Sequence, residues 1–106
     1  MGCWFVYLIR TGSGTLYTGI TTDTQRRFAE HCSGGARAAK ALRGKGPLTL
    51  EYQTETPDKP TALKLERAIK RWPKQKKEGL IAGKEPLPHV GIRPTGKLRD
   101  KKTQIP

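Results

Sequence analysis

Two strand-like segments near the N-terminus constrain the fold of this chain more than any other feature. Residues 4–10 form an unbroken run of apolar, aromatic and β-branched side chains, and residues 16–21 form a second such run. Between them, Gly12 and Gly14 can supply the positive φ angles of a tight turn. A short turn forces the two strands it joins to pair antiparallel. The sequence therefore predicts a β-hairpin over 4–21 and excludes a doubly wound parallel sheet.

A helix is expected directly after the hairpin, over about 24–32. Asp23 is a good N-cap, because its carboxylate can accept from the free amides of the first turn. Ser33-Gly34-Gly35 ends the helix. The alanine-rich residues 36–42 are compatible with a short helix, and residues 43–47 are expected to form a mobile basic loop.

A third strand and two further helices complete the predicted fold. Residues 48–54 alternate Leu48, Leu50 and Tyr52, which is typical of a strand. Pro60 lies near the start of a helix that runs to about residue 71. Pro73 interrupts it, and a short helix follows over about 74–82. The apolar stripe of the longer helix, at spacings of three and four, consists of Ala62, Leu65, Ile69 and Trp72.

The element order predicts an α+β fold, in which helices flank a small, mostly antiparallel sheet of three strands made by the hairpin and one more strand. With 106 residues the chain has room for one domain. We assign that domain to residues 1–83. Residues 84–106 are rich in proline and basic side chains and poor in apolar ones, so they are predicted to form a flexible basic tail.

The charge of the chain points to a polyanionic partner. There are 21 Lys and Arg against 9 Asp and Glu, a formal net charge of +12. Such a field attracts nucleic acid. No apolar run is long enough to span a membrane, and no basic helix has a broad Leu, Phe or Trp face, so a membrane partner is not expected. We read no signal peptide and no CxxC metal pair, and we expect a monomer in the reducing cytoplasm.

Four side chains near the hairpin and the first helix are candidates for chemistry. Tyr7 and Tyr17 should lie close together on paired strands, where tyrosines are usually core residues. Arg27 and His31 project from the same side of the helix, since they are four residues apart. A guanidinium there could bind a phosphate through two parallel hydrogen bonds. The alternatives are an Arg27 that merely pairs with Glu30 and a structural His31.

Glu66 is the most informative carboxylate in the sequence. It falls on the otherwise apolar stripe of the longer helix, where a carboxylate is costly unless a metal ion or a cation meets it. Asp23 and Asp58 are explained as helix caps, Glu51 as the solvent side of a strand, and Glu78 by its neighbouring lysines. The alternative for Glu66 is an ion pair with Lys70.

Two basic runs are spaced as if to follow a sugar-phosphate backbone. The first contains Arg37, Lys40, Arg43 and Lys45. The second contains Lys64, Arg67, Lys70, Arg71, Lys74, Lys76 and Lys77. A charge run is usually only a solvated face, but these two lack matching acids.

Taken in order, these residues resemble the GIY-YIG nuclease family over about residues 4–82, most closely its small stand-alone bacterial members. The matching segments, in chain order, are Val6-Tyr7-Leu8, Tyr17-Thr18-Gly19, Ile20-Thr21-Thr22-Asp23, Arg26-Arg27-Phe28, Glu30-His31 and Leu65-Glu66-Arg67. Each half-motif alone is weak, whereas the ordered series of tyrosines, Arg-x-x-x-His and a later helical Glu is specific.

The resemblance implies a metal-dependent endonuclease that hydrolyses phosphodiester bonds in DNA, in repair, recombination or nucleic-acid processing. One Mg²⁺ or Mn²⁺ would be held by Glu66 with waters. Tyr7 would act as general base, with a pKa depressed by nearby positive charge or with His31 receiving its proton. Tyr17 would orient the phosphate or water, and Arg27 would stabilise the pentacovalent phosphorus. The predicted substrate-binding residues are Gly19, Thr21, Arg37, Lys40, Arg43, Lys45 and Lys70.

The chain departs from the family pattern at three places. Phe5-Val6 replaces the first Gly-Ile pair, Ile20 stands where the repair members carry a Lys, and no Asn follows the helical Glu. One alternative is therefore a nucleic-acid-binding protein without catalysis, and another is an RNA-associated or ribosome-associated basic protein. A small domain has little surface for base readout, so weak sequence specificity or a targeting protein partner is expected.

Overall fold

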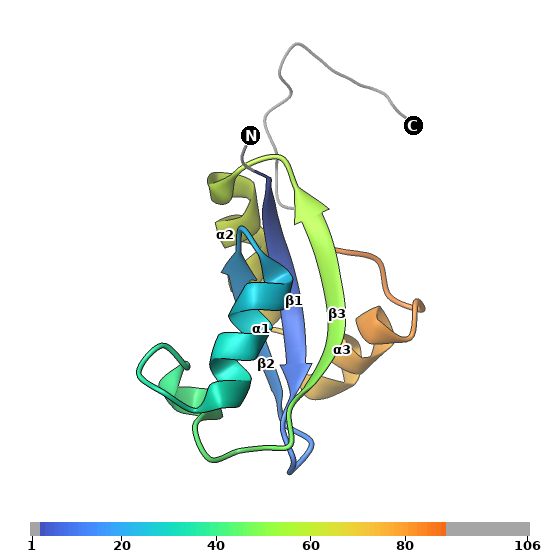
Figure 1. Cartoon of the computed structure of the whole chain (residues 1–106). Coiled ribbons are helices and arrows are strands. Elements are labelled where there is room, and N and C mark those ends of the chain that lie inside the picture. The colour runs from blue at the N-terminus through green and yellow to red at the C-terminus, as the bar shows by residue number, and fades with distance from the viewer. Residues whose placement is uncertain (1–2, 89–106) are drawn as a thin grey trace, which may run out of the picture.

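A computed structural model describes residues 3–88 and contains three strands and three helices in these residues. The elements in chain order are β1 (Trp4–Arg10), β2 (Leu16–Thr21), α1 (Thr24–Ser33), a 3₁₀ turn η1 (Lys40–Leu42), β3 (Thr49–Thr56), α2 (Lys59–Lys70) and α3 (Lys74–Ile81). Figure 1 shows the arrangement. The strand order is β2-β1-β3 and both pairings are antiparallel. The predicted α+β fold is confirmed, and both hairpin strands have the predicted bounds.

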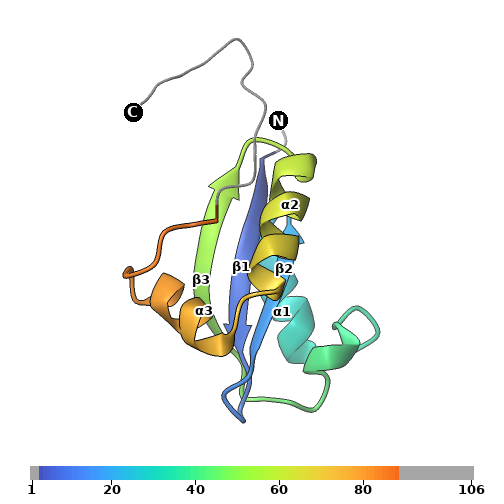
Figure 2. The same cartoon turned by 180° about the vertical axis from the view of Figure 1, so that it is seen from behind.

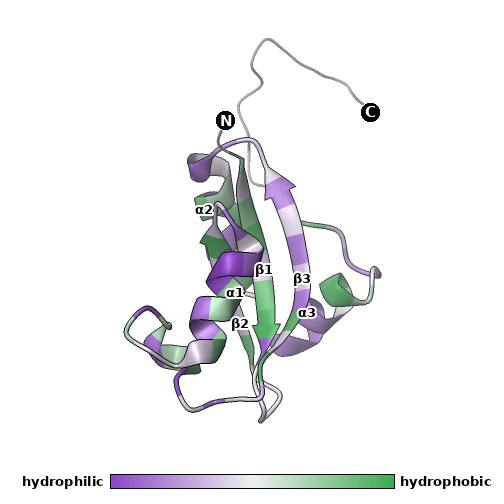
Figure 3. Ribbon diagram, viewed as in Figure 1, coloured by the Kyte–Doolittle hydropathy of each residue, from purple (hydrophilic) through white to green (hydrophobic). Residues whose placement is uncertain are grey.

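Helices cover both faces of the sheet. Helix α1 lies on one face in Figure 1, and the reverse view in Figure 2 shows α2 and α3 on the other. Alternate residues of β1 supply the two cores. Val6 and Leu8 pack with residues of α2 and α3, including Leu65. Tyr7 and Ile9 pack on the α1 side. In Figure 3 the central strand β1 carries green segments, whereas the edge strand β3 is mostly purple and white.

The predicted helix caps are present in the structure. The Asp23 carboxylate accepts from the backbone N–H of Arg26, and the Asp58 carboxylate accepts from that of Thr61. Gly34 follows α1 in the left-handed conformation, which a glycine adopts without a steric penalty. The stripe of α2 is confirmed, because Ala62, Leu65 and Ile69 are buried and Trp72 packs against them.

Packing in the structure departs from the local sequence pattern at two places. The alternation of Leu48, Leu50 and Tyr52 does not place them on one face, because a β-bulge shifts the register between β1 and β3: Leu48 and Leu50 pack on the α1 side and Tyr52 on the other. Cys32 is exposed, and His31 takes the buried position on α1 instead. The alanine-rich segment does contain a short helix, the 3₁₀ turn η1, at its last three residues.

The predicted tail lies mostly on residues 89–106, outside the described residues. Its first part is bonded to α3, since the amides of Lys84 and Glu85 both donate to the carbonyl oxygen of Gly79, at 2.8 and 3.1 Å. The Glu85 carboxylate lies 3.8 Å from the Lys76 ammonium. No helix in the described part of the chain is long and apolar enough to cross a membrane.

Arg10 ties α3 to the sheet at the end of β1. Its two terminal nitrogens donate to the Glu78 carboxylate at 2.6 and 2.7 Å, and its Nε donates to Glu51, the bulge residue of β3, at 2.9 Å. The sequence suggested that Glu51 faces solvent and that Glu78 is explained by the lysines around it. In the structure both carboxylates bind Arg10. A bidentate pair of this kind is geometrically specific and stronger than a neutral hydrogen bond.

Replacing Arg10 with Gln should lower the free energy of unfolding by about 1–2 kcal/mol, because the pair is only partly screened by solvent. Urea unfolding at constant pH measures this difference. Lys64→Gln on the exposed side of α2 removes the same charge and is the matched control. Equal stability of the two variants would contradict a structural role for Arg10.

Candidate active site

The phenol of Tyr7 lies over the edge strand of the sheet. Strand pairing places Tyr7 directly opposite Gly19 of β2. A Cβ atom at position 19 would collide with the Tyr7 hydroxyl and with the ring carbon that bears it. The phenol can therefore cross β2 only because residue 19 has no side chain. The Tyr7 residue is 2% exposed, so its polar end needs partners from the protein.

His31 is the first of these partners, and its own contacts define its tautomer. A neutral imidazole has one N–H and one bare acceptor nitrogen. The backbone N–H of Ala39 donates to Nδ1 at 3.2 Å, so Nδ1 is the bare nitrogen and Nε2 carries the hydrogen. Nε2 then donates to the Tyr7 oxygen at 2.9 Å. This arrangement leaves no bare nitrogen to receive the Tyr7 proton, unlike the role expected from the sequence.

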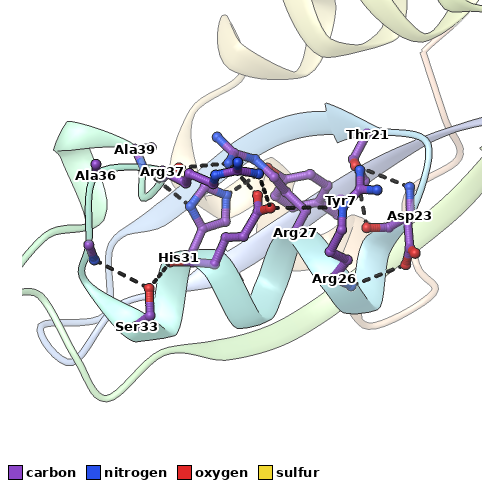
Figure 4. A network of polar contacts seen from close by, with 12 residues as sticks. Tyr7, Thr21, Asp23, Arg26, Arg27, His31, Ser33, Ala36, Arg37 and Ala39 are labelled. Carbon is purple, nitrogen blue, oxygen red and sulfur yellow. Dashed lines mark hydrogen bonds and ion pairs between the residues drawn. The ribbon is translucent and has the colours of Figure 1, made fainter.

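Burial determines the charge of His31. The side chain is 1% exposed, and this burial, followed by the positive charge of Arg27, lowers the pKa of His31 below its usual value. The ring is therefore neutral at neutral pH, which preserves its bond to Ala39. Figure 4 shows His31 between Tyr7 and the segment that carries Arg37 and Ala39.

Tyr17 completes a cluster of three rings. Its ring centroid lies 6.4 Å from that of Tyr7 and 5.7 Å from that of His31, and it meets the His31 ring edge to face. Tyr17 is half-buried and stands beside Ile9 on the same face of the hairpin. The predicted proximity of the two tyrosines is thus confirmed, with His31 as the third member of the cluster.

Arg27 is held at the border of this cluster by two contacts. Its Nη1 donates to Glu30 at 2.8 Å and to the backbone oxygen of Arg37 at 2.7 Å. The Glu30 contact is the alternative that the sequence left open. Figure 4 shows Arg27 beside Tyr7, with Arg37 also within this network.

The phenol of Tyr7 is strongly resistant to ionisation in the free protein. Burial, and then the neighbouring Tyr17, raise the pKa of Tyr7 to about 12, while the Arg27 guanidinium opposes the rise. The sequence analysis allowed for a Tyr7 pKa depressed by nearby positive charge. In the free protein the nearby positive charge is too weak to bring this pKa below that of a free phenol. The oxygen nevertheless accepts from Nε2 of His31 and lies near a guanidinium, and both would stabilise a phenolate once it forms.

Glu66 approaches the same edge of the sheet from the opposite face. Its side chain is 16% exposed, and its carboxylate lies 3.4 Å from the Lys70 ammonium. This is the ion pair that the sequence analysis gave as the alternative to a metal ligand. The carboxylate is close enough to Tyr7 to make a small contribution to its raised pKa. Among the described residues, no group of three His, Cys, Asp or Glu side chains is placed to hold a metal ion.

An open hollow of about 590 Å³ adjoins this cluster. Its lining comes from the start of β1, the end of β2, α1 and the segment after α1: Trp4, Ile20, Thr21, Thr22, Arg26, Arg27, Glu30 and Arg37. The predicted residue Thr21 also shapes the turn into α1, since its Oγ1 accepts from the amide of Asp23 at 3.1 Å. The predicted site residues did not include Trp4, Ile20, Thr22, Arg26 or Glu30, although the Arg26-Arg27 pair was a signal for Arg26.

The basic segment after α1 is anchored at several points. Arg43 donates to the carbonyl oxygen of Ala36 at 3.2 Å, and the amide of Gly12 donates to the carbonyl oxygen of Lys45 at 2.7 Å. Lys40, Arg43 and Lys45 are exposed, so their charges remain available to a partner. The structure thus connects the segment expected to be a mobile loop to the hairpin turn and to the residues that follow α1.

Comparison with known proteins identifies the family. The GIY-YIG catalytic domain matches residues 3–79. The chain belongs to the GIY-YIG family. The match covers the three strands, α1, α2, most of α3 and every side chain of the cluster around Tyr7.

Its relatives are small bacterial proteins whose names state no activity. The chain is 58% identical over 78 residues to a UPF0213 protein of Yersinia pestis, and equally to one of Yersinia pseudotuberculosis; each alignment covers 74% of this chain and 80% of the relative. The solution NMR structure of the UPF0213 protein BH0048 from Bacillus halodurans is similar, with a TM-score of 0.50, 38% identity, and coverage of 77% and 85% of the two chains.

Gly19→Ala should destabilise the domain by about 1–3 kcal/mol, because the new methyl group collides with the Tyr7 phenol. In a Tyr7→Leu background, where the long ring is gone, the same Gly19→Ala change should cost much less. A double-mutant cycle by urea unfolding measures this coupling. Additive effects of the two changes would mean that the glycine is needed for another reason.

Acid should weaken the fold through His31. Its folded pKa is lowered, so the unfolded chain takes up the proton first and the free energy of unfolding falls as the pH drops below about 6.5. Protonation of Nδ1 also abolishes its bond with the Ala39 amide. Unfolding curves over a pH series should show this loss in the wild type and a flatter dependence in His31→Gln. Parallel profiles would show that His31 is not the titrating group.

Proposed function

We propose that this protein is a metal-dependent endonuclease that hydrolyses phosphodiester bonds in DNA and acts in repair, recombination or another form of nucleic-acid processing. The observation that carries the proposal is the phenol of Tyr7, which accepts from His31 and lies beside Arg27 next to a hollow lined with arginines. Membership of a nuclease family and a net charge of +12 both support a nucleic-acid substrate. We expect the protein to act in the cytoplasm as a monomer, brought to its sites by a partner protein.

The donor set fits one hydrated divalent ion. Glu66 offers a half-buried carboxylate near the Tyr7 phenol, and its present partner is an exposed lysine that could release it. Mg²⁺ and Mn²⁺ accept one protein carboxylate when waters and substrate phosphate oxygens supply the other ligands. Glu66 would hold the ion, which when bound would neutralise charge on the phosphate and on the leaving oxygen.

Tyr7 is the proposed general base, and its neighbours define how its proton can leave. Nε2 of His31 and the Arg27 guanidinium can only donate, so neither can receive the phenol proton. The proton would therefore pass to a water or to a phosphate oxygen of the bound substrate. His31 acts as a fixed donor that orients the phenol and stabilises the phenolate. Because the pKa of Tyr7 is about 12 in the free protein, positive charge brought with the bound substrate has to lower it.

The remaining residues would bind and orient the substrate. Arg27 would stabilise the negative charge that develops on the phosphorus oxygens, and Tyr17 would orient the scissile phosphate or the attacking water. Gly19 would act on the substrate through Tyr7, because it leaves the room over β2 that the phenol occupies. Further contacts to the phosphate backbone are assigned to Thr21, Arg37, Lys40, Arg43, Lys45 and Lys70.

Arg27→Ala and Glu66→Ala should each reduce cleavage by at least about 100-fold, since each removes charge stabilisation from the transition state. Labelled single-stranded and duplex DNA and structured RNA, incubated with Mg²⁺, Mn²⁺ or EDTA, form the assay. Arg67→Ala, on an exposed part of α2, is the control for loss of one positive charge. Full activity in either site variant would refute the assignment.

A second candidate is nucleic-acid binding without catalysis. It is favoured by the two ion pairs that occupy the site residues, Glu66 with Lys70 and Arg27 with Glu30, and by the absence of an asparagine after Glu66. Salt-dependent binding without cleavage under every metal condition, unchanged in Arg27→Ala, would favour this candidate. A preference for structured RNA over DNA at equal salt would instead favour an RNA-associated protein.

A further inference from the structure

The carboxylate of Glu30 stands among three arginines in the wall of the hollow. Its Oε1 lies 2.8 Å from Nη1 of Arg27. Its Oε2 lies 3.8 Å from Nε of Arg26 and 3.6 Å from Nη1 of Arg37. One negative charge thus faces three positive ones, so this wall keeps an excess of two positive charges. Such a wall is complementary to one more anion.

The three contacts of Glu30 differ in strength. The Arg27 bond is short, and the Arg27 side chain is 27% exposed and also bonded to the Arg37 backbone. The Arg26 and Arg37 side chains are 59% and 80% exposed, and their contacts are longer than a hydrogen bond. Exposed pairs of this kind are worth little and are readily exchanged. Arg26 and Arg37 can therefore move to an incoming anion while Arg27 stays in place.

Two apolar residues also line the hollow. Trp4 and Ile20 contribute to its lining, and both are half-buried. They pack against the core on the α2 side of the sheet, where the Lys59 ammonium lies 5.2 Å from the centroid of the Trp4 ring. A nucleotide combines a charged phosphate with a sugar and a base that can contact an aromatic side chain. Arginines and Trp4 in the lining of one hollow fit a nucleotide better than a free inorganic anion, which would use only the arginines.

We propose that this hollow binds one nucleotide of the DNA strand next to the scissile phosphate, with its phosphate on Arg26 and Arg37 and its base or sugar against Trp4. Glu30 is the internal anion that holds the three arginines together until that phosphate arrives, and it keeps Arg27 beside Tyr7 afterwards. Arg26 and Glu30 thereby become substrate-binding and positioning residues. The inference rests on the proposed function for its ligand, but the site itself is defined by binding and not by cleavage.

The test measures DNA binding in EDTA, so that it is independent of catalysis. The probe is a short fluorescent thymidine oligonucleotide, titrated at several salt concentrations. Arg26→Gln with Arg37→Gln should weaken binding about tenfold or more and reduce the salt dependence by about two counterions. Lys64→Gln with Arg67→Gln removes the same charge from the exposed side of α2 and should weaken binding less. Equal losses in the two double variants would overturn the subsite.

The Glu30→Gln variant tests whether the Glu30 carboxylate competes with the phosphate, as distinct from the effect of a change in the net charge of the protein. Removing the competing carboxylate should tighten binding about threefold or more, while the loss of its hold on Arg27 lowers the turnover rate of any cleavage. Glu55→Gln, an exposed residue of β3, makes the same change in net charge and should leave affinity nearly unchanged. Weaker binding by Glu30→Gln, or an equal gain in Glu55→Gln, would show that Glu30 does not compete with the phosphate.

Tryptophan fluorescence reports on Trp4 in the lining of the hollow. The chain has two tryptophans, so Trp72→Phe leaves Trp4 as the only reporter. Saturating oligonucleotide should quench Trp4 in this background, and the quenching should disappear when Arg26 and Arg37 are also replaced. Binding without any change in Trp4 emission would place the strand elsewhere and overturn the proposal. Failure to cleave DNA in Mn²⁺, with the binding results intact, would count against the nuclease function alone.

Discussion

The contact between the Tyr7 phenol and the backbone of Gly19 connects the fold of this domain to its site. The phenol reaches the outer edge of the sheet only because β2 offers no side chain at the opposing position. The ring of the same residue fills the core between the sheet and α1, beside Ile9 and Leu42. Packing and chemistry thus depend on one side chain, and His31 holds its polar end from the buried side. A residue held in this way loses little entropy when a substrate arrives.

The electrostatics of the site follow from its position between buried and exposed surroundings. Burial is the main cause that disfavours the phenolate of Tyr7 and the imidazolium of His31, so both groups are neutral in the free protein. The positive charge lies one layer further out, on Arg27 and on the arginines around Glu30, where solvent still reaches it. A phosphate strand would pass first through the charged layer and then meet the neutral pair. Charge therefore attracts the substrate, while the buried pair stays in the state that its hydrogen bonds require.

Local signals in the sequence predicted the elements well, because each was determined by residues close to one another. The hairpin, the caps at Asp23 and Asp58, and the stripe of α2 all agree with the structure. The errors arose where distant partners decide. Glu51, at the bulge, and Glu78, on α3, both bind Arg10 of β1. These residues are far apart in the sequence, so no local pattern predicts the contacts. The tautomer of His31 depends on the amide of Ala39, in a segment whose path could not be deduced from its composition.

The segment between α1 and η1 touches both the charged layer and the buried pair. The backbone oxygen of Arg37 accepts from Arg27, and two residues later the amide of Ala39 donates to His31. A force on the Arg37 side chain would therefore reach the phenol of Tyr7 through only two hydrogen bonds. Both hydrogen bonds depend on the number of residues between His31 and Ala39. A single residue inserted there would break the Arg27 bond to Arg37 and the Ala39 bond to His31. Variation in length is better accommodated after Leu42, where residues 43–47 are exposed and lead toward the hairpin turn.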